Sequence, residues 1–531
     1  MKPHCFPALR RILSVCLLAI AFCASAAERP NIVVILVDDM GFSDIGCYGG
    51  EMSTPNIDRL AKDGLRFTQF YNTGRCCPTR ASLLTGLYSH QAGIGQMVDD
   101  KKLPGYRGFL NDRCVTLGEA LHAAGYFTAV SGKWHVGHSD ESMWPLQRGF
   151  DRFYGTTEGG GFYFKVKAGR TIREGNELLY SQDKQPPAGW YTTDAWTDNG
   201  IKFVNEALDE KKPFFLYLAH NAPHFPLQAP EAEVAKYRGK FKAGWDKLRA
   251  ERYERMVRLG IVESTWALSP RPDNIKPWDK LTAEEQDRFD NMMAVYAAVI
   301  EKLDSNIGRL VDALKKRDAL DNTLILFLSD NGGTAEGGPN GRSNGPGAMG
   351  SADSDVYYGP GWATLSNTPY RRYKIQNHEG GISTPLIAHW PAQIKDKGAL
   401  RHQVGHVIDL MPTCLEVAGA KYPTEFKGKP IQPMEGKSLL PAFKNQPLER
   451  TALYWEHFGN AAVRAGDWKL VRFGKNGPWE LYDLRIDRTE LKDLATENPA
   501  KAKELTAIWE AWALRANVKP APGEGGGKKK K

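Results

Sequence analysis

The chain has 531 residues, more than one simple hydrophobic core accommodates, so we expect one large domain and one smaller domain. A hydrophobic content of 42% and a charged content of 25% are typical of a soluble globular protein. Much of the net charge of +8 lies in basic runs at the two ends, and such runs are usually solvated, so the charge gives little support for a nucleic-acid partner.

The first residues have the pattern of a signal peptide. Arg10-Arg11 precede an apolar stretch, Ile12 to Cys23, which small residues follow. This stretch is about a dozen residues long, whereas a membrane span needs roughly twenty, which disfavours the alternative of an uncleaved anchor. A lipoprotein anchor is also disfavoured, because Cys23 follows Phe22. We expect a cleaved signal peptide over residues 1–26, no membrane span, and a periplasmic or secreted protein.

Three of the eight cysteines fall in the signal segment. The other five are too few and too scattered for a scaffold built on disulfides, and their odd number marks one of them for special chemistry. These five are Cys47, Cys76, Cys77, Cys114 and Cys414.

From Asn31 to about Thr424, strand-like and helix-like segments alternate. Ile32–Val37 is a continuous apolar, β-branched run, typical of a strand buried on both faces. Further strands are predicted over Tyr126–Val130, Pro213–Ala219 and Leu324–Leu328. Helices are predicted between them, opening at Thr54-Pro55, at Thr116, and through Val299 to Leu314. This order predicts an α/β fold with a large, mostly parallel sheet flanked by helices.

The pattern divides the chain into four parts. A catalytic α/β domain is expected over residues 27–425, with a charged helical insertion at 229–290 and a Gly-rich, substrate-facing loop at 332–367. Short strand-like pieces followed by a helix predict an α+β subdomain with a small antiparallel sheet over 426–516. Residues 517–531 are expected to form a disordered basic tail, and 1–26 are the signal peptide.

Polar residues follow each predicted strand of the large sheet. Ligands of open α/β sheets bind beyond the carboxyl ends of the strands, so these residues are expected to meet at one rim. They are Asp38 and Asp39, Lys133 and His135, His220 and His224, and Asp330 and Asn331.

Asp38, Asp39, Asp330 and Asn331 form an all-oxygen set. Oxygen ligands suit a hard cation, Ca²⁺ or Mg²⁺, rather than zinc. Either pair alone has a plainer interpretation as the cap of the following helix. The two pairs together favour a metal site.

Cys76-Cys77-Pro78-Thr79-Arg80 is the most informative run in the sequence. A helix from Pro78 to Gly86 places Cys76 at its N-terminus, where free N–H groups attract anions and Arg80 adds a fork of donors. The alternatives are a reactive thiol or a vicinal pair with a redox or metal role. Adjacent cysteines rarely meet disulfide geometry, and two thiolates without partner cysteines make a poor zinc site.

This run matches the sulfatase signature Cys-x-Pro-x-Arg followed by Leu-Thr-Gly, and the chain from about Arg29 to Ala516 resembles a type I sulfatase. The family fold resembles alkaline phosphatase. Five further motifs agree in order: Val37-Asp38-Asp39, Gly132-Lys133-x-His135, Ala222-Pro223-His224, Asp330-Asn331-Gly332 and Lys374-x4-Glu379-Gly380-Gly381.

The resemblance implies that a dedicated maturation enzyme oxidises Cys76 to formylglycine, with Cys77 at the variable position. One oxygen of the aldehyde hydrate then attacks sulfur and leaves a sulfated enzyme, and the second hydroxyl expels sulfate. Thr79 stands where serine is commonest, a departure expected to affect maturation more than chemistry.

The resemblance also implies the other roles. Ca²⁺, rather than Mg²⁺, is expected to bind Asp38, Asp39, Asp330, Asn331 and the modified Cys76. Arg80 and Lys133 would hold the modified side chain, and His135 would assist elimination. Lys374 and His224 would bind sulfate, with His224 protonating the leaving oxygen. His220 is the alternative acid, although a lone histidine is more often structural.

The first hypothesis is therefore a hydrolase that cleaves sulfate from sulfated carbohydrate or aryl esters. The second is a phosphonate monoester or phosphodiester hydrolase on the same scaffold. The third is a sulfated-glycan binding protein that is never matured. The sequence makes no prediction of the physiological substrate or the oligomeric state.

Overall fold

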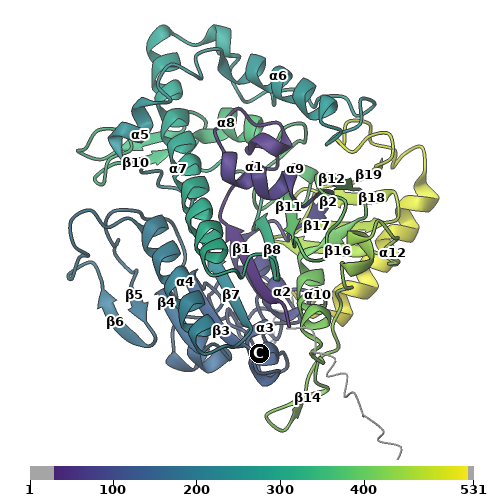
Figure 1. Ribbon diagram of the computed structural model, residues 1–531. Coiled ribbons are helices and arrows are strands. Elements are labelled where there is room, and N and C mark those ends of the chain that lie inside the picture. Colours follow the sequence, from purple (N-terminus) through teal and green to yellow (C-terminus); the bar gives the residue numbers. More distant parts are fainter. Residues whose placement is uncertain (1–28, 524–531) are drawn as a thin grey trace, which may run out of the picture.

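The computed structural model describes residues 29–523 (Figure 1). The expected signal peptide and the last eight residues of the expected basic tail lie outside these residues. Within the described part, no helix combines the length and apolar character that crossing a bilayer requires.

An eleven-stranded mixed sheet forms the centre of the large domain. Its strand order is β12-β2-β11-β8-β1-β7-β3-β4-β5-β6, with β13 paired to β2. The central strands β8, β1, β7, β3 and β4 run parallel, while β11, β5 and β6 pair antiparallel with their neighbours. The strands are β1 Asn31–Val37, β2 Leu65–Tyr71, β3 Phe127–Lys133, β4 Arg152–Thr156, β5 Ile172–Glu174, β6 Glu177–Tyr180, β7 Phe214–Ala219, β8 Thr323–Ser329, β11 Ser383–His389, β12 Ala399–Arg401 and β13 Gly405–His406.

Helices cover both faces of this sheet. Val33, Ile35 and Val37 of β1 face a core shared with one helical layer, and Ile32, Val34 and Leu36 face the core of the other layer. The first layer contains α1 Pro55–Lys62, α4 Thr192–Asp209 and α7 Ala283–Lys316, and the second contains α2 Cys76–Thr85, α3 Leu117–Ala123 and α10 Leu410–Ala418. Because both faces are covered, β1 is apolar at nearly every position.

The predicted α/β fold is confirmed, and the four predicted strands correspond to β1, β3, β7 and β8. Two strands that the sequence did not reveal, β2 and β11, extend the sheet beyond β8. Pro385 lies inside β11, where the register shifts between Thr384 and Leu386. A proline inside a run normally argues against a strand, so local pattern alone hides this one.

The two segments that interrupt the alternation carry short elements. Residues 229–290 contain α5 Glu231–Ala235, α6 Gly244–Arg258 and the start of α7, where Thr282 and Glu285 form both halves of the expected capping box. Residues 332–367 contain the pair β9 Arg342–Asn344 and β10 Asp355–Tyr357 and the helix α8 Gly359–Ser366.

The C-terminal part forms a four-stranded antiparallel sheet in the order β16-β17-β18-β19, as expected. Helix α12 packs against it, and both lie at the yellow-green end of the chain in Figure 1. The elements of this part, with the short ones before it, are α9 Glu379–Ile382, β14 Glu425–Phe426, β15 Lys429–Pro430, α11 Leu440–Phe443, β16 Leu453–His457, β17 Asn460–Ala465, β18 Trp468–Arg472, β19 Trp479–Asp483 and α12 Pro499–Arg515.

A fully buried ionic network joins the two sheets. The Glu379 carboxylate accepts hydrogen bonds from Tyr71 of β2 at 2.9 Å, from Lys469 of β18 at 2.8 Å and from Arg488 at 2.9 Å. The Lys469 ammonium also lies 2.8 Å from the Glu490 carboxylate. Glu379 of the expected Glu-Gly-Gly motif therefore fastens the C-terminal sheet to the large one.

Replacing Lys469 by methionine is expected to destabilise the protein by about 3–5 kcal/mol, because it removes the buried cation that Glu379 and Glu490 share and leaves Glu379 with Arg488 alone. Chemical denaturation monitored by circular dichroism measures this change. Lys492→Met is the matched control, since that side chain is 69% exposed and its ion pair with Glu497 contributes little. Equal stability of the two variants would contradict the role given to the network.

Candidate active site

The carboxyl ends of four adjacent strands form the candidate site. In the sheet order β8-β1-β7-β3, Asp330 follows β8, Asp38 follows β1, His224 lies just beyond β7, and Lys133 ends β3. Paired registers such as Val37 with Ser329 and Leu36 with Ala219 bring these ends level. The expectation that the four strand ends share one rim agrees with this topology.

The oxygen-bearing residues gather closely. Asn331 donates from its amide to Asp39 Oδ1 at 2.7 Å, and the Asp39 backbone N–H donates to Asp330 Oδ1 at 3.3 Å. Asp38 Oδ1 and Asn331 Oδ1 are buried and make no hydrogen bond to any residue between 29 and 523. Buried oxygens without a donor are unusual, and a cation bound among them would satisfy both. The residues present therefore fit a hard divalent metal.

Three cations hold this acidic cluster. Arg80 Nη2 lies 3.2 Å from Asp38 and 2.9 Å from Asp330, and Lys133 Nζ lies 2.5 Å from Asp38. Lys374 Nζ lies 2.8 Å from Asp39. All of these side chains are buried.

The pKa values of the three carboxyl groups shift in different directions. Burial opposes ionisation of Asp38, but Lys133, His224 and Arg80 outweigh it and lower its pKa to about 2. Burial raises the pKa of Asp39 and raises that of Asp330 further, and in both cases the charge of Asp38 adds to the effect. A divalent cation bound among these groups would offset both the burial and the repulsion from Asp38, and would stabilise the ionised carboxylates.

Cys76 is the first residue of α2, with Arg75 extended before it and Gly86 ending the helix at φ 67°. The thiol is 2% exposed. A hydrogen bond from Cys77, followed by the charges of Lys133 and His135, holds the pKa of Cys76 well below its ordinary value despite burial. The family resemblance implies that the mature protein carries an aldehyde hydrate at position 76. The Cys76 sulfur occupies the place of the oxygens of that hydrate.

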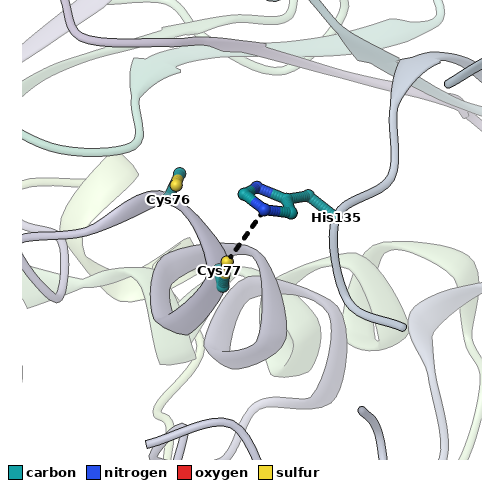
Figure 2. A group of neighbouring side chains, drawn as sticks. All are labelled: Cys76, Cys77 and His135. Carbon is teal, nitrogen blue, oxygen red and sulfur yellow. Dashed lines mark hydrogen bonds between the residues drawn. The ribbon is translucent and has the colours of Figure 1, made fainter. Parts of the chain in front are cut away.

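Sequence reasoning missed the part played by Cys77. Figure 2 shows its thiol facing the imidazole of His135, with Sγ 3.2 Å from Nε2. His135 lies 58 residues further on, so no local pattern could have revealed the contact. His135 has a φ of 56° and Asp39 a φ of 71°, a left-handed conformation that side chains rarely adopt. Such strain is common where function constrains the backbone.

Lys374 and His224 lie together on the other side of the cluster. Lys374 Nζ is 3.3 Å from His224 Nε2, and burial together with Lys374 lowers the pKa of His224 to about 3. Lys374 is also 3.3 Å from the Glu336 carboxylate, a neighbour not expected from the sequence. His220 is fully buried, and its ring nitrogens have no hydrogen-bond partner in the described chain.

A divalent metal ion that binds this site should stabilise the folded protein, because it binds only the folded state. We expect Ca²⁺ added to chelator-treated protein to raise the midpoint of thermal unfolding. Asn331→Ala should reduce the shift by removing one oxygen, whereas Asn331→Asp should retain it. Differential scanning calorimetry measures the shift, and an unchanged shift in Asn331→Ala would exclude this residue as a ligand.

Comparison with known proteins agrees with the geometry. The family model Sulfatase matches residues 30–420, and the model for the C-terminal region of N-sulphoglucosamine sulphohydrolase matches residues 372–511. The chain is 36% identical to an uncharacterised sulfatase of Schizosaccharomyces pombe, over 93% of this chain and 95% of that protein. It is 35% identical to the arylsulfatase of Klebsiella aerogenes, over 78% of this chain and 92% of that protein.

A solved structure extends the similarity to the fold. The crystal structure of Ps i-CgsB in complex with k-i-k-neocarrahexaose is 28% identical, with a TM-score of 0.69, and the alignment covers 93% of this chain and 94% of that one. The catalytic layout and these comparisons agree, and this chain belongs to the sulfatase family and is a sulfatase.

Proposed function

We propose that the protein removes sulfate from sulfated carbohydrate or aryl esters through a formylglycine made from Cys76. The observation that carries this proposal is the position of Cys76, at the N-terminus of α2 and close enough to Asp38, Asp330 and Lys133 to interact with them electrostatically. An oxygen of the hydrated aldehyde attacks sulfur and the ester oxygen leaves. The remaining hydroxyl then loses its proton, sulfate departs, and the aldehyde is restored.

Five residues of this chain have distinct roles in the proposed reaction. Arg80 and Lys133 hold the modified side chain, and His135 assists the elimination of sulfate. Lys374 and His224 bind the sulfate group, which their 3.3 Å separation permits. Burial, followed by the charge of Lys374, lowers the pKa of His224 to about 3. The negative charge of the bound sulfate group acts in the opposite direction and favours the protonated imidazole, which gives its proton to the leaving oxygen.

The metal in this proposal is Ca²⁺, held by Asp38, Asp39, Asp330, Asn331 and the modified Cys76. It supplies positive charge that activates the nucleophile and attracts sulfate oxygens. The unsatisfied oxygens of Asp38 and Asn331 support the assignment.

The biological setting forms part of the proposal. The saccharide in the Ps i-CgsB complex supports a sulfated carbohydrate as substrate. A periplasmic or secreted location rests on the N-terminal pattern of residues 1–26. A formylglycine-generating enzyme is the expected partner during maturation.

Protein produced together with a formylglycine-generating enzyme is expected to hydrolyse 4-nitrophenyl sulfate in the presence of Ca²⁺. Cys76→Ala should abolish turnover, since it removes the thiol whose oxidation converts this side chain to the aldehyde. Peptide mass spectrometry measures conversion of Cys76 in the parent protein. Faster hydrolysis of a phenylphosphonate ester would favour the phosphonate hydrolase instead, and a Cys76 found wholly as thiol would favour a glycan-binding protein.

The contact between Cys77 and His135 gives a second test of the mechanism. Cys77→Ala should lower kcat by about tenfold, because His135 loses the partner that orients it. Cys77→Ser keeps a hydroxyl in place of the thiol and should retain more of the rate. Activities are compared per molecule of converted Cys76, which separates catalysis from maturation. Equal kcat values in all three proteins would show that the contact does not assist the reaction.

A further inference from the structure

Arg75, the residue immediately before Cys76, is a cation that the mechanism above does not use. Its side chain is only 15% exposed. The Nε and Nη1 atoms are buried, and across residues 29–523 they find no hydrogen-bond acceptor. Its ion-pair partner is Glu336, whose Oε1 lies 3.7 Å from Nη1, beyond hydrogen-bond length. A guanidinium offers five donors, so an unsatisfied one beside a nucleophile points to an absent acceptor.

Glu336 connects Arg75 to the sulfate-binding residues. Its second oxygen, Oε2, lies 3.3 Å from Lys374 Nζ. One carboxylate therefore lies between the two cations, which places Arg75 within one sugar ring of the position proposed for the sulfate group. Glu336 itself is 35% exposed and belongs to the segment 332–367, so a ligand can displace it more easily than it can displace the buried Asp39.

Two further side chains near Gly74 and Arg75 have polar atoms without a hydrogen-bond partner among residues 29–523. Asn377 is fully buried, and neither atom of its amide is hydrogen-bonded within the described residues. Its Oδ1 lies 3.5 Å from the place where a Cβ on Gly74 would stand. His457, at the end of β16, is fully buried with Nε2 unpaired, and Arg75 is close enough to help lower its pKa.

We propose that Arg75, with Asn377 and His457, forms a second anion subsite, next to the one that binds the ester sulfate. It takes a further anionic substituent on the leaving group, a carboxylate or a second sulfate, whose oxygens accept from the Arg75 guanidinium. Glu336 occupies this place in the substrate-free protein and is displaced. The inference rests on the proposed function, because it assumes that the ester sulfate binds at Lys374 and His224.

The subsite predicts that the protein prefers substrates whose leaving group carries a further anionic substituent. The matched probes are phenyl sulfate, its 2-, 3- and 4-carboxy derivatives, and 1,3-phenylene disulfate. In the parent protein at least one probe with a second anionic group should have a lower KM than phenyl sulfate. Arg75→Gln should raise that KM by about tenfold, the effect of losing a charge-assisted hydrogen-bonded pair, and leave phenyl sulfate nearly unchanged.

Three further variants control the experiment. Arg258→Gln removes an equal charge from a side chain that is 67% exposed on α6, and should not alter the preference. Arg75→Lys keeps the charge without the planar fork and should give an intermediate KM. Glu336→Gln should lower the KM of the doubly charged probe, because the competing carboxylate is gone. Mass spectrometry of residue 76 corrects each rate for maturation.

Binding measured without turnover separates the two proposals. Titration calorimetry in a Cys76→Ala background, which has neither a thiol nor a hydroxyl to convert to the aldehyde, should show about tenfold weaker binding of the preferred probe when Arg75→Gln is added. If the parent protein shows no turnover but Arg75→Gln still weakens binding, the sulfatase mechanism is overturned and the subsite is retained. An equal effect of Arg75→Gln on singly and doubly charged probes, or no effect in either measurement, would overturn the subsite. A lower KM for the carboxy derivatives alone shows that the subsite binds a carboxylate, and a lower KM for the disulfate alone shows that it binds a sulfate group.

Discussion

The balance of buried charge at the carboxyl ends of β1 and β8 governs the arrangement of the whole site. Asp38, Asp39 and Asp330 sit where water cannot reach them, and such carboxylates are tolerated only with cations at hydrogen-bond distance. Arg80 and Lys133 come from different layers of the fold to meet this need. Helix α2 is therefore positioned by electrostatics as well as by its apolar packing, and its first residue, Cys76, is positioned with it.

The need to pair each buried carboxylate with a cation also explains why the residues of the site come from distant parts of the sequence. Each cation arrives on a different element: α2 carries Arg80, β3 ends in Lys133, and the loop before α9 carries Lys374. A shift of α2 would separate Asp330 from Arg80, and a shift of the loop before α9 would separate Asp39 from Lys374. A reaction in which negative charge develops on the leaving oxygen and on the departing sulfate benefits from cations that are already fixed.

Local patterns in the sequence predicted the parts of the fold that local forces determine. Ile32–Val37 is apolar throughout because both faces of β1 are covered, and the Thr282 capping box forms as expected. β11 escaped prediction because Pro385 contradicts the strand pattern locally, while pairing with β2 and β8 compensates for it. Motif order named the polar residues of the site, yet the contacts of Cys77 with His135 and of Glu336 with Arg75 depend on tertiary structure alone.

The junction at Glu379 has a consequence for how the two sheets share one task. Lys374 stands five residues before Glu379, and Glu379 is clamped by Lys469 and Arg488 of the C-terminal part. The short segment between Lys374 and Glu379 limits how far Lys374 can lie from this ionic network. If Lys374 binds the sulfate group as proposed, the C-terminal sheet sets where that group can lie. A chain ending before β16 would keep Cys76 yet lose this constraint on Lys374.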